Sequence, residues 1–261
     1  MTITGTGGAW NTSTVTNLTC TSSGRIRFTG ASPTMNPGNV SAGCYNDLEF
    51  SVSGTAHLTA GTSTITFNDI FATGNGTLIM DSSGFPAFVV HSIDFTGFTG
   101  TWGAGTNPIT LTGSLTLGSG MTHSYTGTLT FTATSGTQTI TSNGITLAST
   151  ITENGSGGTL NFADAFENRA SMTLTAGTMT FGAEASISGT LTLTSGTLDA
   201  NNQNLTLGLF NGGGTSTRTL TMGSGLWTMT GTGNVFITNN TTGLTMTGGN
   251  VVVNNSTTTS K

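Results

Sequence analysis

The chain has 261 residues, of which only 6% are charged, and it contains 40 Gly and 61 Thr. An average globular protein has about a quarter charged residues, so this composition is unusual. The net charge of −5, with five Lys and Arg in total, excludes the dense basic surface that nucleic-acid binding requires. The longest apolar runs are short, which excludes a membrane-spanning helix.

The first part of the chain is irregular and contains both cysteines and three of the four prolines. We interpret residues 1–104 as an irregular cap or attachment region, and residues 105–261 as the regular repeats of the same fold. The separation of Cys20 and Cys44 in the sequence is close to the length expected for one coil of that fold. If one coil takes that length, the two side chains lie on neighbouring coils and are candidates for a disulfide. The alternative is that both are buried as small hydrophobic residues.

Three aromatic residues lie close together in the segment "DFTGFTGTWG", which belongs to the irregular part. Aromatic faces stack on sugars, so Phe95, Phe98 and Trp102 are candidates for a ligand-facing cluster. The alternative is that they pack in the core or between subunits.

From about residue 105 the sequence repeats short alternating phrases that are typical of β-strands. In "GTLTLTSGTLDANNQNLTLGLF" (189–210), Leu and Thr alternate before each Ser-Gly or Asn turn. The phrase "MTLTAGTMT" (172–180) matches "LTLTSGTLD" (191–199), which follows it closely in the chain. Such recurrence at coil-like spacing predicts an all-β fold, a single parallel β-solenoid (β-helix) with about 20 residues per coil. An antiparallel β-sandwich is the alternative, but it gives no reason for repetition.

The segment "FADAFENRASM" (162–172) is the best candidate for a helical turn, or else for an enlarged loop. It contains Asp164 and Glu167, which together with Glu153 form one of two groups of carboxylates. The other group is formed by Asp69, Asp81 and Asp94.

Neither carboxylate group has enough neighbouring Arg, Lys or aromatic residues to hold a sugar for cleavage. His57, His91 and His123 lack the spacing of metal ligands, although stacked coils could bring His57 near Asp69 or Asp81. The sequence therefore predicts no catalytic residue, no metal site, no cofactor and no enzymatic activity.

Thr-x-Thr tracts place hydroxyl and methyl groups in rows along the predicted strands. The arrangement resembles the flat Thr arrays of ice-binding solenoids, although Thr also suits any exposed strand. The tracts contain Thr128/Thr130/Thr132/Thr134, Thr137/Thr139/Thr141, Thr190/Thr192/Thr194 and Thr217/Thr219/Thr221.

Three longer phrases resemble the repetitive Thr- and Gly-rich modules of large bacterial surface proteins and phage virion proteins. They are "YNDLEFSVSGTAHLTAGTSTITF" (45–67), "SGTLTLTSGTLDANNQNLTLGLF" (188–210) and "TRTLTMGSGLWTMTGTGNVF" (217–236). The resemblance implies an extracellular or virion-borne β-solenoid and carries no catalytic residues with it.

These observations predict a structural subunit of an extracellular filament or virion fibre that acts by self-association. The alternative is an adhesin or receptor-binding fibre that recognises a glycan or cell surface, and a minor alternative is an ice-binding solenoid. Both ends of the sequence resemble strands without protective charge, so Ile3 and the run Val251, Val252 and Val253 are candidate assembly edges. We expect a homo-oligomer, and we expect Val252→Lys to impair its assembly.

Overall fold

The computed structural model describes residues 2–3, 7–11, 24–36, 45–60, 64–82 and 87–254. Within these residues the chain is all-β, without a helix, and its coils stack in parallel as a β-solenoid of about 10 turns. The predicted fold is therefore confirmed, and an antiparallel sandwich is excluded. The chain divides into two compact units, residues 1–129 and 130–261. The sequence boundary at residue 104 lies inside the first unit.

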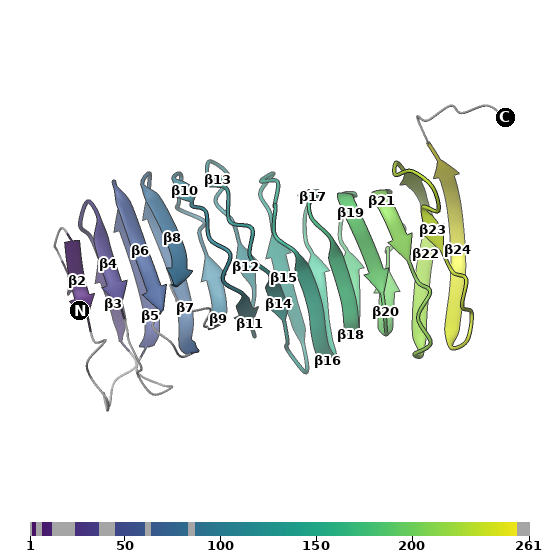
Figure 1. Cartoon of the computed structure of the whole chain (residues 1–261), viewed down its shortest axis with the longest axis horizontal. Coiled ribbons are helices and arrows are strands. Elements are labelled where there is room, and N and C mark those ends of the chain that lie inside the picture. Colours follow the sequence, from purple (N-terminus) through teal and green to yellow (C-terminus); the bar gives the residue numbers. More distant parts are fainter. Residues whose placement is uncertain are drawn as a thin grey trace. The chain divides into compact units, whose positions relative to one another are not determined.

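The first unit builds each coil mainly from one strand of each of two parallel sheets (Figure 1). The first of these runs through β1 (Thr2–Ile3), β3 (Arg25–Phe28), β5 (Tyr45–Val52), β7 (Ile65–Gly74), β9 (Phe88–Asp94), β11 (Ile109–Leu111) and β12 (Leu115–Thr116). The second runs through β2 (Gly7–Asn11), β4 (Pro33–Asn36), β6 (Thr55–Ala60), β8 (Thr77–Ser82), β10 (Thr101–Trp102) and β13 (Thr122–His123).

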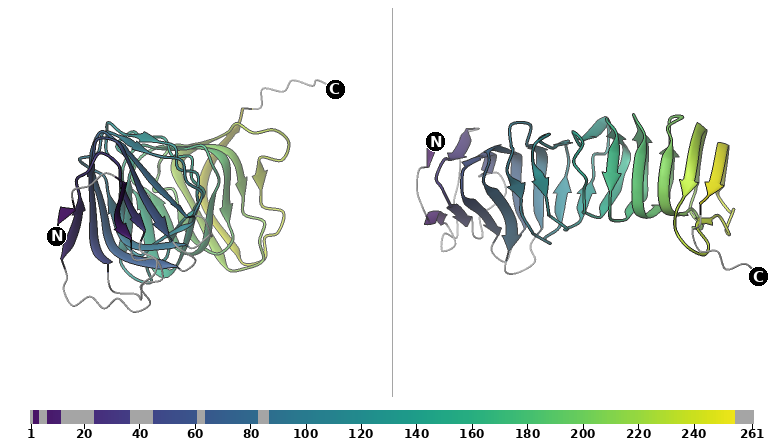
Figure 2. Two further views of the ribbon diagram at one scale, coloured as in Figure 1. Left: turned by 60° about the vertical axis from the view of Figure 1, so that its left-hand side comes forward. Right: turned by 90° about the horizontal axis from the view of Figure 1, so that it is seen from above.

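The second unit contains longer strands that bend at the corners of the coil, and Figure 2 shows its coils winding around an interior. The strand β14 (Leu129–Phe131) begins at the unit boundary. It is followed by β15 (Thr137–Thr141), β16 (Ile151–Phe162), β17 (Phe166–Asn168), β18 (Met172–Phe181), β19 (Ala185–Leu193), β20 (Gly196–Asp199), β21 (Leu205–Asn211), β22 (Arg218–Met229), β23 (Phe236–Ile237) and β24 (Leu244–Val253).

The strand register gives the length of each coil. The separation in sequence between paired residues on neighbouring coils is the length of one coil. Of three representative pairs, Met172 and Leu191 have the shortest separation. The pairing of Arg25 with Asp47 spans a longer coil, and that of Arg218 with Leu244 spans a longer one still. The predicted coil of about 20 residues is thus correct for the shortest turns, and longer loops extend the others.

The corners of the second unit depend on glycine. The register of β16 and β18 shifts between Asn154 and Thr159, where the chain turns. On the next coil Gly177 has a φ of +75°, and a Cβ there would lie 2.3 Å from the carbonyl oxygen of Gly155. Only glycine accepts both that backbone conformation and that close approach, so the Gly-rich corner allows the coils to stack.

The core consists of the inward-facing residues of each strand. In the second unit Leu160, Met179 and Leu198 stack on one another in register and are fully buried. The Thr residue that precedes each of them on its strand faces outward. This is the period-two alternation that the sequence indicated. The segment 162–172 forms no helix: Phe162 ends β16, and residues 166–168 form the short strand β17.

Candidate functional site

The three aromatic residues proposed to face a ligand lie in the core. Phe95, Phe98 and Trp102 are each 0% exposed. The Trp102 ring meets Phe95 edge to face, with centroids 5.3 Å apart, and stacks on Tyr125 at 4.8 Å. The rings therefore stabilise the first unit, and none of them offers a face to a ligand at the surface.

The other residues singled out in the irregular part are described only in part. Cys20 and Cys44 lie outside the described residues. Ile3 belongs to β1, where it pairs with Phe28 of β3.

Stacking brings two histidines beside carboxylates. His57 Nδ1 lies 3.9 Å from Asp81 Oδ1, which is one of the two neighbours expected for it. The other, Asp69, lies beside His91 instead, with its Oδ1 2.8 Å from His91 Nδ1. Within the described part of the chain, no three His, Cys, Asp or Glu side chains are grouped so that they could hold a metal ion.

His123 is different, because its ring is covered by aromatic side chains. Its ring meets Trp102 edge to face at 5.1 Å, and neither ring nitrogen has a hydrogen-bond partner among the described residues. Burial lowers the pKa of His123 to about 4, so the ring is neutral at pH 7.

A network of charged side chains covers the outer face of β3, β5 and β7. Arg27 Nη2 lies 2.7 Å from Glu49 Oε1, and Arg25 Nη1 lies 3.3 Å from Glu49 Oε2. The Arg25 guanidinium also lies 3.9 Å from the centroid of the Phe71 ring. Both arginines are thus engaged by the protein itself, so this cluster is not a free basic patch.

The carboxylates of the second unit have three different environments. Asp164 accepts hydrogen bonds from the backbone N–H groups of Ser142 and Asn143, so it stabilises a turn. Glu153 is 0% exposed; its Oε1 accepts the Gly155 N–H at 2.9 Å, while Oε2 has no partner among the described residues. Burial raises the pKa of Glu153 to about 7, against the opposing effect of the Gly155 hydrogen bond.

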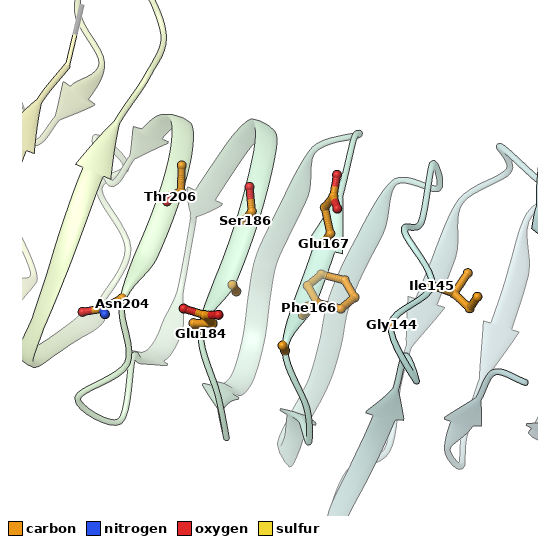
Figure 3. A pocket seen from close by; sticks show the side chains of 10 residues that line it. Gly144, Ile145, Phe166, Glu167, Glu184, Ser186, Asn204 and Thr206 are labelled. Atoms are coloured by element: carbon orange, nitrogen blue, oxygen red, sulfur yellow. The ribbon is translucent and has the colours of Figure 1, made fainter. Parts of the chain in front are cut away.

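Glu167, the third member of that group, lines a surface groove of about 320 Å³ in the second unit. The groove crosses the beginnings of β17, β19 and β21 on successive coils (Figure 3). In Figure 3, Glu167, Ser186 and Thr206 form one row, and Glu184 and Asn204 form the other. Two carboxylates, an amide and two hydroxyls therefore converge on one concave surface.

Sequence reasoning missed Glu184 and Asn204 as partners of Glu167. The segments 161–172, 181–189 and 198–205 contain no Thr in a chain that has 61, but the longer stretches 35–54 and 78–95 also contain none, so this pattern does not single them out. The stacking of the coils places the first three segments side by side along the groove.

The outer edge of β24 is a second feature with functional potential. β24 pairs with β22 along its length, and no further strand pairs with it among the described residues. Met246, Val251 and Val253 stand in register with the core residues Leu220, Trp227 and Met229, yet they are 41%, 40% and 55% exposed. Val252, at 49%, is in register with the outward-facing Thr228.

Comparison of the chain with protein-family models, with curated proteins and with solved structures finds no match. Among the described residues, no helix has the length and hydropathy needed to cross a membrane.

Proposed function

We propose that this protein is a structural subunit of an extracellular filament or virion fibre, and that it acts by self-association of its β-solenoid. The observation that carries the proposal is the edge of β24. There, a full-length strand has one side that no described strand covers, and an apolar row that continues the core lies open to solvent. Unpaired strand edges of this kind are templates for pairing with another chain.

A second copy of the chain is the occupant that fits this edge. A strand added in register would cover Met246, Val251 and Val253, just as the coils beneath cover one another. With 6% charged residues, copies of the protein repel one another weakly. If β24 of one copy pairs with a different edge of the next, the contact can repeat from copy to copy and gives a filament where the rotation between copies does not close a ring. If β24 pairs with β24 of a second copy, the result is a dimer.

Sedimentation velocity over a wide concentration range, combined with negative-stain microscopy, tests the proposal. We expect Val253→Lys to abolish assembly, because it places a charge directly over Met229 in the new interface. The matched variant Val252→Lys places the same charge on the outward row, so we expect it to weaken assembly less. Compact monomers of the unaltered protein at all concentrations would overturn the proposal.

The second candidate function is ice binding, and a ladder of threonines favours it. Thr137, Thr159, Thr178, Thr197, Thr219 and Thr245 occupy one register position on a series of strands in the second unit, each paired with the next. The parallel spacing of coils places such residues about 4.8 Å apart in a regular row. The row two residues further along is interrupted by Asn161 and Asp199, which weakens this candidate.

Inhibition of ice recrystallisation separates the two candidates. If the ladder binds ice, Thr197→Lys in its middle should remove the inhibition while β24-dependent assembly persists. Absence of inhibition by the unaltered protein would eliminate this function.

The adhesin alternative was based on exposure of Phe95, Phe98 and Trp102, and this basis is removed because all three are buried. Its support comes instead from the groove of the second unit.

A further inference from the structure

We propose that the groove across β17, β19 and β21 is a binding site for a neutral oligosaccharide. The inference goes beyond self-association and does not depend on it, because the groove involves no residue of β24.

The floor of the groove is apolar and just reaches the surface. Phe166 and Ala185 belong to the inward-facing row, yet they are 3% and 5% exposed, whereas Leu191 and Leu193 on the same strand β19 are 0% exposed. Phe166 and Ala185 thus form a buried apolar base, and the lining residues Ile145 and Ala165 add apolar side chains that are more exposed. Such a floor can contact the C–H groups of a sugar ring.

The walls offer hydrogen-bonding groups of both kinds. The carboxylates of Glu167 and Glu184 are acceptors, and no salt bridge in the described part of the chain engages either of them. Ser186 and Thr206 contribute hydroxyl groups that donate and accept. Carboxylates that accept hydrogen bonds from hydroxyl groups form stronger bonds than neutral acceptors do.

Asn204 supplies a donor whose orientation is fixed. Its Oδ1 accepts the backbone N–H of Leu226 at 2.8 Å, so its Nδ2 is the group left to donate. The neighbouring backbone groups are already used, since Phe166 N–H donates to the Glu184 carbonyl and Ala185 N–H donates to the Asn204 carbonyl. The side chains alone therefore face the ligand.

The charge of the groove selects among ligands. Two carboxylates without a basic side chain in the lining repel anionic saccharides. A metal ion is a poor fit, because the described residues include no group of three suitable ligands. A neutral chain of hydroxyl-rich rings satisfies the acceptors, the donor and the apolar floor together.

The groove also departs from the surface around it. Elsewhere on the second unit the outward positions of paired strands are mostly Thr, as in Thr173 beside Thr192 and Thr178 beside Thr197. In the groove, Glu167 and Ser186 hold two of these positions on consecutive coils before Thr206 resumes the pattern, and Glu184 and Asn204 line the groove beside them. A solvated strand surface alone does not require this change, because Thr serves it elsewhere.

Isothermal titration calorimetry of the full chain tests the inference, with neutral hexasaccharides of glucose, mannose, galactose and N-acetylglucosamine as probes and a hexasaccharide of galacturonic acid as the anionic comparison. We expect at least one neutral probe to bind with a Kd below about 1 mM, and the anionic probe to bind at least tenfold more weakly. No binding of any neutral probe, or equal binding of the anionic one, would overturn the inference.

Two sets of variants locate the binding. Ser186→Trp fills the groove and should weaken binding at least tenfold, whereas the control Thr178→Trp, on the outward face of β18, should leave it unchanged. Should Ser186→Trp fail to fold by circular dichroism, Glu167→Gln with Glu184→Gln provides the test, because it removes both charges at nearly constant volume. That pair should reduce the discrimination against the anionic probe, and Asp199→Asn, outside the groove, should not.

Unchanged binding and discrimination in these groove variants would overturn the assignment. Release of shorter saccharides from any probe would also overturn it, because it would indicate a hydrolase rather than a binding site. The assembly state, measured on the same samples, reports on β24 separately.

Discussion

The two units of the molecule place their charges differently. On the first unit Arg25 and Arg27 both pair with Glu49 on the outer face of β3 and β5. The second unit instead encloses Glu153 and Arg218, which are 0% and 1% exposed, beneath a surface rich in Thr. In a chain with so few charges, the first unit thus pairs two exposed arginines with one buried carboxylate, whereas the second unit buries charged side chains that bond to the backbone.

The buried groups also give the two units opposite responses to pH. His123 in the first unit has a folded-state pKa of about 4, below its ordinary 6.5, so its contribution to stability is lost as the pH falls from 6.5 toward 4. Glu153 in the second unit has a folded-state pKa of about 7, above its ordinary 4.5, so stability is lost as the pH rises from 4.5 toward 7. Acid therefore stresses one unit and neutral pH stresses the other.

The largest effect should come from the aromatic core of the first unit. Trp102→Ala removes the ring that contacts Phe95, His123 and Tyr125, and we expect a loss of about 3–5 kcal/mol in the free energy of unfolding. Urea denaturation followed by circular dichroism measures it. Trp102→Phe keeps an aromatic ring and should cost less than half as much; equal costs would show that the ring contacts do not determine the packing.

The next effect should come from the buried guanidinium of the second unit. Arg218 donates hydrogen bonds to the backbone carbonyls of Gly212, Ser216, Asn240 and Thr242, and so it joins two loops. Arg218→Met keeps the apolar stem but leaves these carbonyls without their donor, so we expect a loss of about 2–3 kcal/mol.

Hydrogen exchange locates the effect of Arg218→Met. Protection should fall in residues 212–216 and 240–242 before it falls elsewhere in the second unit. Arg218→Lys retains the charge with fewer donors, so it should lose an intermediate amount of unfolding free energy. A loss equal to that of Arg218→Met would show that the shape of the guanidinium matters rather than the charge.

These two residues show what the sequence could and could not predict. The solenoid was predictable, because alternation and repetition are local patterns that appear directly in the order of residues. From the sequence, Trp102 is a candidate for a ligand-facing cluster because it lies near Phe95 and Phe98, with packing in the core as the alternative; the register of β10 with β8 and β13 decides for the core. No sequence pattern indicated that Arg218 is buried, since its four carbonyl partners come from loops whose paths no local pattern defines.

The groove illustrates the same limit. Glu167, Glu184 and Asn204 are unequally spaced in the sequence, and the length of a coil varies along this chain. A shift of one residue moves a side chain to the other face of the strand, so spacing alone cannot bring these side chains together.

The pH response of the second unit provides a third prediction. Glu153→Gln keeps an oxygen that can accept the Gly155 N–H but cannot ionise, so the variant should not lose stability between pH 4.5 and 7 as the unaltered protein does. We expect the difference to reach about 2 kcal/mol at pH 8, since movement of nearby groups relieves part of the burial penalty. Thermal unfolding at a series of pH values measures it, and parallel curves for the two proteins would contradict the assignment of Glu153.

The first unit should respond in the opposite sense. His123→Phe preserves an aromatic ring beside Trp102 and removes the titrating group, so the loss of stability between pH 6.5 and 4 should shrink by about 1–2 kcal/mol. His57→Phe is the matched control, because His57 is partly exposed beside Asp81. An equal change in both variants would show that the acid response does not come from the buried ring.

The smallest effect should come from the surface network. The Arg27 side chain is 48% exposed, and Glu49 keeps Arg25 as a second partner, so Arg27→Gln should cost less than about 1 kcal/mol. Because salt screens exposed pairs, the difference between variant and unaltered protein should diminish further in about 0.5 M NaCl, whereas the loss in Arg218→Met should not. Denaturation of both variants at low and high salt makes this contrast directly.

The contradicting outcome is a cost for Arg27→Gln of about 3 kcal/mol or more that does not depend on salt, as for a broken buried pair. It would mean that the charges of the first unit act as buried links as well. The difference between the two units would then lie only in their titrating groups.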